Sequence, residues 1–183
     1  MGENPIDSVQ GYIENANIRM QAGDLLNRCL DEGCEAPIQQ LIEELVLAGP
    51  QNIQVLHEIL SETEQRRTQV SDDIQQLSLG VEASLETYGI HLGDARSPRS
   101  TVRMSQSGFL KLLRQQQVND EITQLACLQI LKDARELMES LEFRLRLLKK
   151  IEAYIRDWLL GLTYQSVHQS ERHSSTTPPA RPH

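Results

Sequence analysis

The most regular pattern in the chain lies between Gln51 and Tyr88, where apolar positions recur at alternating steps of three and four residues. This spacing predicts a coiled-coil helix over residues 51–89, because it keeps one apolar seam facing a neighbouring helix. Gly89 is the expected C-cap. The seam consists of Ile53, Leu56, Leu60, Thr63, Arg67, Val70, Ile74, Leu77, Val81, Ser84 and Tyr88.

A second helical segment is predicted over residues 109–167, which are rich in leucine and isoleucine at helical spacing. Asn119 or Asp120 could cap a fresh helix, so the pattern leaves open whether this segment is one helix or two. Four leucines widen its apolar stripe, which indicates contact with more than one helix. They are Leu137, Leu147, Leu159 and Leu160.

Residues 1–50 predict two shorter helices. Asn4 and Pro5 suit the start of the first, since Asn caps and Pro fits the first helical turn. Gly23 and Asp24 either break this helix or cap it afresh before Leu25. The second helix follows Pro37 and ends at Gly49.

Two stretches lack helical periodicity. Residues 90–108 are rich in Ser, Gly and Arg and predict a flexible loop between the long helices. Residues 168–183 are polar and end in Pro-rich sequence, which predicts a disordered tail. Together these elements predict an all-α protein, an elongated helical hairpin or coiled coil whose two long helices fold back across the loop.

Composition supports this fold class and adds a charge asymmetry. Aromatic residues make up only 4% of the chain, which argues against an all-β fold. The net charge is −8, but residues 1–92 carry 4 basic and 16 acidic side chains whereas residues 93–183 carry 14 and 10. The two halves could therefore pair electrostatically, within one chain or between copies.

The sequence offers little catalytic chemistry. It contains neither a Gly-x-x-x-x-Gly-Lys loop nor a Gly-x-Gly-x-x-Gly loop, and no histidine has a glutamate three residues before it. Cys29, Cys34 and Cys127 are most simply interpreted as free thiols, because their spacing does not fit a zinc site. We therefore expect no enzyme activity, no metal and no cofactor.

Two groups of charged residues could carry interactions. Arg67 occupies a seam position, where it could reach solvent or set the helix register by pairing with an opposing acid. The predicted loop alternates arginines with serines, a pattern that suits phosphate binding or regulation by phosphorylation. Its residues are Arg96, Ser97, Arg99, Ser100 and Arg103.

These features predict a non-enzymatic scaffold, adaptor or assembly subunit that acts through helix–helix contacts, either with itself or with a helical partner. One alternative is a regulatory protein that contacts nucleic acid through its basic second half, which the overall negative charge disfavours. Another is a membrane-surface helical hairpin, which is disfavoured because the first helix lacks a basic flank. Without an apolar membrane segment or a leader, the expected location is the cytoplasm or nucleus. The predicted interface residues are Leu56, Leu60, Arg67, Val70, Ile74, Leu77, Leu141, Leu145, Leu148, Trp158 and Leu159.

Overall fold

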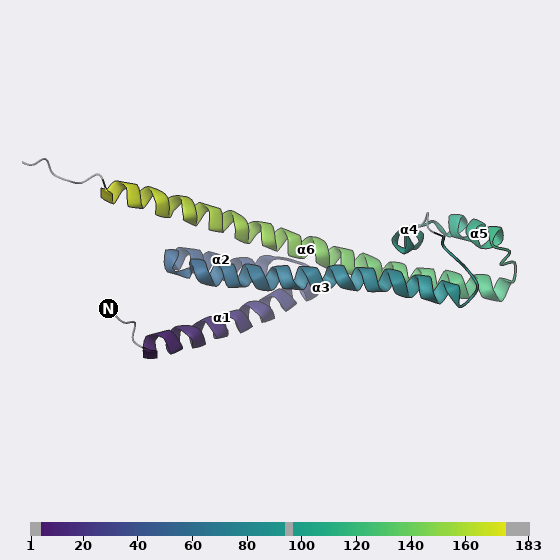
Figure 1. The fold of residues 1–183 in the computed structure, drawn as a ribbon, viewed down its shortest axis with the longest axis horizontal. Helices are drawn as coiled ribbons and strands as arrows, with labels where there is room; N and C mark the ends of the chain where they lie inside the picture. Colours follow the sequence, from purple (N-terminus) through teal and green to yellow (C-terminus); the bar gives the residue numbers. More distant parts are fainter. Residues whose placement is uncertain (1–4, 94–96, 175–183) are drawn as a thin grey trace, which may run out of the picture. The chain divides into compact units, whose positions relative to one another are not determined.

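The computed structural model describes residues 5–93 and 97–174, with side-chain environments for residues 16–93 and 97–164. Within these ranges the regular structure is entirely helical, which confirms the all-α prediction (Figure 1). The elements are α1 (Pro5–Glu32), α2 (Ala36–Ala48), the 3-10 turn η1 (Pro50–Asn52), α3 (Ile53–Glu86), α4 (Pro98–Val102), α5 (Gln106–Gln115) and α6 (Glu121–Ser174).

Helix α1 passes through Gly23 without a break. A Cβ atom at this position would lie 3.4 Å from a guanidinium nitrogen of Arg66 on α3, which is an ordinary van der Waals distance. Arg66 in turn donates a hydrogen bond of 2.5 Å to Asn27 on α1. This hydrogen bond joins α1 to α3.

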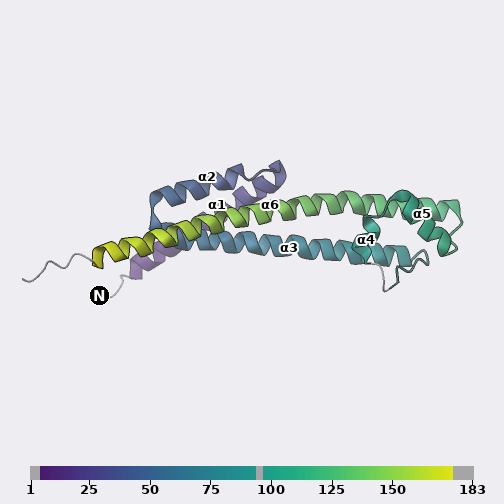
Figure 2. The same cartoon turned by 90° about the horizontal axis from the view of Figure 1, so that it is seen from above.

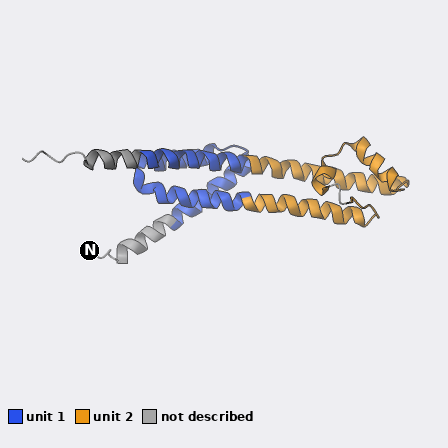
Figure 3. Cartoon of the chain, turned by 45° about the horizontal axis from the view of Figure 1, so that its top comes forward, with its two compact units in different colours: residues 1–67, 147–183 blue, residues 68–146 orange. Residues whose placement is uncertain are grey.

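The chain divides into two compact units, which Figure 3 colours separately. Unit 1 comprises residues 1–67 and 147–183, and unit 2 comprises residues 68–146. Helices α3 and α6 each contribute to both units.

In unit 1, α1 and α2 pack with the first half of α3 and the second half of α6. Two ion pairs show that α3 and α6 run antiparallel here: Arg67 Nε lies 2.7 Å from Glu152, and Arg156 lies 2.7 Å from Glu64. Thr63 is fully buried but satisfied, because its hydroxyl donates to the carbonyl of Ile59 at 2.8 Å. The apolar core contains Ala22, Leu26, Cys29, Ile38, Leu41, Ile42, Val55, Leu56, Ile59, Leu147, Leu148, Ile151, Ile155, Leu159 and Leu162.

In unit 2, the second half of α3 lies beside the first half of α6, and α4 and α5 lie next to α6 (Figures 1 and 2). Phe109 on α5 is the largest fully buried side chain among those that the structure describes. The core contains Val70, Ile74, Val81, Leu85, Ile90, Leu92, Val102, Phe109, Leu112, Leu113, Cys127, Leu131, Ala134, Met138 and Leu141.

Helices α1, α3 and α5 end in the same way. Each is followed by a residue of positive φ, namely Gly33 (71°), Gly89 (75°) and Gln117 (63°). The next amide then donates back to a carbonyl five residues earlier, which is the hydrogen bond of a Schellman motif. These bonds join Cys34 to Cys29 (3.1 Å), Ile90 to Leu85 (3.1 Å) and Val118 to Leu113 (2.9 Å).

The stretch predicted as a flexible loop, residues 90–108, contains regular structure. Ser97 and Ser105 accept hydrogen bonds from the amides of Ser100 and Gly108, so they cap α4 and α5. Thr101 and Val102 on α4 are buried. Two serines of this stretch, Ser97 and Ser105, are therefore helix caps, a role for which serine is as well suited as it is for loops.

The long second segment is two helices. Asp120 caps α6, since its carboxylate accepts a hydrogen bond of 2.7 Å from the amide of Thr123. At its other end α6 continues to Ser174, into the stretch predicted as a tail from residue 168. Its glutamine, glutamate and arginine favour continuation of a helix that is already formed. Residues 175–183 of the predicted tail lie outside the described part of the chain.

Candidate functional site

An apolar groove lies between α3 and α6 within unit 2. It encloses about 370 Å³ and is bounded largely by aliphatic side chains and one glycine. Its residues are Leu77, Gly80, Val81 and Ser84 from α3, and Ile130, Asp133, Ala134 and Leu137 from α6.

The groove is open to solvent. Leu137 is 51% exposed, and a Cβ atom placed on Gly80 would have no neighbour within 4 Å. Asp133, the single charged side chain of the lining, is exposed and accepts a hydrogen bond of 2.6 Å from Gln129 of its own helix. The arrangement therefore offers an aliphatic channel with a negative charge at its edge, which is the kind of surface that an amphipathic helix fills.

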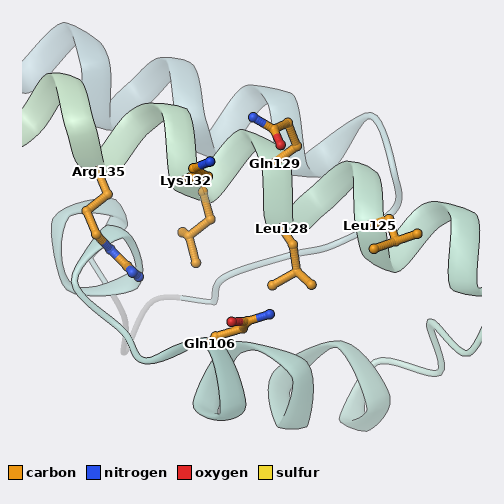
Figure 4. A pocket seen from close by; sticks show the side chains of 7 residues that line it. Gln106, Leu125, Leu128, Gln129, Lys132 and Arg135 are labelled. Atoms are coloured by element: carbon orange, nitrogen blue, oxygen red, sulfur yellow. The ribbon is translucent and has the colours of Figure 1, made fainter.

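A second hollow lies between α5 and α6 and encloses about 380 Å³. Figure 4 shows Leu128 and Arg135 directed from α6 toward the segment that carries Gln106. Arg135 is engaged within the unit, because its guanidinium donates to the carbonyls of Val102 (3.2 Å) and Met104 (2.5 Å). This hollow is more polar than the α3–α6 groove, and the guanidinium of Arg135 is already hydrogen-bonded within the unit.

The predicted regulatory arginines converge on one carboxylate. Arg99 donates to Glu142 at 2.8 Å, and Arg103 binds the same oxygen. The hydrogen bond from Arg99 is the main cause that holds the pKa of Glu142 below its ordinary value, and Arg103 adds to it against the effect of burial. Ser97 caps α4 and Ser100 is exposed, whereas Arg96 lies outside the described residues.

We expect the Glu142→Gln variant to be less stable than the wild type by about 0.5–1 kcal/mol at pH 7, a range that allows for solvent around both arginines. Folding lowers the pKa of Glu142, so its contribution is complete above the unfolded value near 4.5 and is lost as the pH falls through the lower folded value. Urea titrations of both proteins from pH 7 to pH 3 should show the two stabilities converging over that acidic window. A stability difference that stays constant down to pH 3 would contradict this assignment.

The chain's own packing occupies much of the predicted interface. Leu56, Leu148 and Leu159 are buried in unit 1, and Val70, Ile74 and Leu141 are buried in unit 2. In free chains these six side chains are not available to a partner, because the helices of each unit cover them. Leu60, Leu77 and Leu145 are only half-buried, and of these Leu77 lines the groove.

Arg67 pairs with Glu152 across the α3–α6 contact in unit 1, as the register interpretation of this seam position expects. Trp158 is half-buried and packs edge-on against Tyr154, with ring centroids 6.3 Å apart. Tyr154 donates a hydrogen bond of 2.9 Å to Glu43 on α2. Burial, and then the neighbouring Glu43, raise the pKa of this tyrosine. These side chains therefore join α6 to α2 and α3.

The two halves of opposite charge meet within unit 1. Lys150 binds Glu35 and Arg156 binds Glu64, so basic side chains of α6 contact acidic side chains of the first half. Lys150 also lowers the pKa of Glu35. Part of the charge asymmetry is thereby neutralised within one chain.

The described residues show no group of three or more histidine, cysteine, aspartate or glutamate side chains that could hold a metal ion. Burial raises the pKa of both Cys29 and Cys127, so neither thiol shows the lowered pKa of a cysteine poised to react first. Helices long and apolar enough to cross a membrane are absent from the part of the chain that was described.

The chain matches none of the protein-family models, curated proteins or solved structures with which it was compared. The fold identifies the protein only as an all-α protein with antiparallel long helices. Any inference about the candidate site therefore depends on the geometry of that site.

The signals that could have revealed the groove were partly present in the sequence. Leu77 and Val81 belong to the predicted seam, and Leu137 lies outside the narrow stripe of α6. Gly80 carries no such signal, since an isolated glycine in a helical pattern has several explanations.

Proposed function

We propose that this protein is a non-enzymatic scaffold that binds an amphipathic helix of another protein in the α3–α6 groove of unit 2. The observation that supports this most directly is the aliphatic groove itself, whose lining includes both half-exposed Leu137 and Gly80, with open space around a Cβ atom built on the glycine. Helix-in-groove recognition uses apolar side chains three, four and seven residues apart, and it needs a channel of this composition.

The edge of the groove indicates the charge of the partner. Among the residues that line the groove Asp133 is the one ionisable group, and it accepts a hydrogen bond from the uncharged side chain of Gln129. A lysine or arginine beside the apolar stripe of the incoming helix would complement this carboxylate and orient the helix.

Gly80 and Gly161 provide a matched pair for the test. Both are exposed helical glycines with open space around a built Cβ atom, but only Gly80 lines the groove. Replacing either by leucine should leave the protein folded and favour its helix by about 0.5–1 kcal/mol. Only Gly80→Leu fills the space that we assign to the partner.

The partner is first trapped through a photoreactive amino acid placed at Leu137 in cells, and the cross-linked segment is sequenced. A synthetic peptide of that segment should be amphipathic and should bind the wild type and Gly161→Leu equally, as measured by fluorescence anisotropy. We expect Gly80→Leu to bind it at least about tenfold more weakly, which corresponds to about 1.4 kcal/mol. Cross-links that map to a second copy of this chain, or equal binding by Gly80→Leu, would refute the proposal.

A further inference from the structure

The cysteines near the end of α1 occupy a position that apolar pairs occupy elsewhere in this protein. In a Schellman motif the first and sixth residues frequently bring their side chains into contact. At the end of α3 these residues are Leu85 and Ile90, and both are buried. At the end of α1 the same two positions hold Cys29 and Cys34.

Backbone geometry brings these two cysteines within reach of a disulfide. The amide of Cys34 donates to the carbonyl of Cys29 at 3.1 Å, and Gly33 supplies the positive φ of 71° that turns the chain back. Covalent bond lengths on either side of this hydrogen bond place the two Cα atoms within about 7 Å of each other. Disulfides span Cα separations of up to about that distance.

The two thiols differ in access. Cys29 is fully buried, whereas Cys34 is partly exposed at the turn between α1 and α2. Burial is the main cause that raises the pKa of Cys29, and the nearby Glu32 and Glu35 add to it. An oxidant in solution therefore meets Cys34 first.

We propose that Cys29 and Cys34 form a redox-active dithiol, which peroxide converts reversibly into a disulfide within the chain. The thiolate of Cys34 attacks one oxygen of hydrogen peroxide, so the O–O bond breaks and a sulfenic acid and hydroxide form. The deprotonated sulfur of Cys29 then attacks the sulfenic sulfur, the S–S bond forms and a second hydroxide leaves. With the two thiol protons, the hydroxides become two molecules of water, so the dithiol is oxidised by two electrons and one peroxide is reduced.

This site is independent of the helix-binding groove, since all of its residues belong to unit 1. Cys127 is the internal control. It is buried in unit 2, and burial raises its pKa, so it should react slowly.

The test treats the full chain with hydrogen peroxide, denatures it with a thiol-alkylating reagent present, and digests it with trypsin. Cys29 and Cys34 fall in one tryptic peptide, residues 29–66, because cleavage follows Arg28 and Arg66. We expect this peptide to lose both alkylation sites and the mass of two hydrogen atoms, and to regain the sites after treatment with dithiothreitol. Cys127 should remain alkylated.

Cysteine variants distinguish the proposed disulfide between Cys29 and Cys34 from oxidation at other positions. Cys127→Ser should form the same disulfide, whereas Cys29→Ser should instead accumulate a sulfenic acid at Cys34 that dimedone traps. Alkylation of both cysteines after peroxide treatment, or a disulfide that links two chains or involves Cys127, would overturn the proposal.

Discussion

Phe109→Ala is expected to destabilise unit 2 by about 3–5 kcal/mol, because truncation of a buried phenylalanine loses apolar burial and leaves a cavity. Phe109 is fully buried and is the largest such side chain among the described residues. The free energy of unfolding is measured by urea titration followed by circular dichroism. Hydrogen exchange in α5 and residues 121–146, compared with exchange in α2, reports which unit is affected.

The matched control is Lys111→Ala on the same helix. Lys111 is exposed, and alanine favours helices at least as well as lysine, so this variant should change stability by less than about 0.5 kcal/mol. If Phe109→Ala were no more destabilising than Lys111→Ala, α5 would not be packed as the structure shows.

The second large effect is expected in unit 1, where Leu148→Ala should cost about 2–5 kcal/mol. Leu148 is fully buried, whereas Leu160 on the same helix and in the same unit is 61% exposed. Leu160→Ala makes the same chemical change and should cost far less. Comparable losses of unfolding free energy in the two variants would contradict the orientation assigned to α6 in this unit.

Local patterns predicted the helices well, because helical spacing and capping residues act over a few positions. The regular steps of the seam led to α3, and Gly89 does end it with a positive φ. The last turn of α3 departs from the pattern: Leu85 is buried, whereas the predicted seam residue Tyr88 lies beyond the helix and is 42% exposed. The turn that ends α3 determines which of these side chains is buried, and the periodicity of the sequence does not predict that turn's geometry.

Helix α4 was missed for a different reason. It has only five residues, and the contacts that fix it come from distant positions. Arg99 and Arg103 bind Glu142, and Arg135 binds the carbonyls at its end, across separations of 31 to 43 residues. A local pattern rich in serine and arginine does not carry that information.

The candidate groove could be predicted only in part. The wide stripe that includes Leu137 indicated more than one helical neighbour, but which apolar residues of unit 2 remain uncovered depends on where α4 and α5 pack. Those placements depend on contacts between remote segments, so the groove required the structure.

The division into units has a consequence for synthesis on the ribosome. Unit 2 is one uninterrupted stretch, residues 68–146, whereas unit 1 needs both ends of the chain. Its contacts join Glu43 to Tyr154 and Glu64 to Arg156, positions separated by 111 and 92 residues. A nascent chain can therefore complete unit 2 first, while the apolar faces of α1 and α2 await the last helix and remain a target for chaperones in the interval.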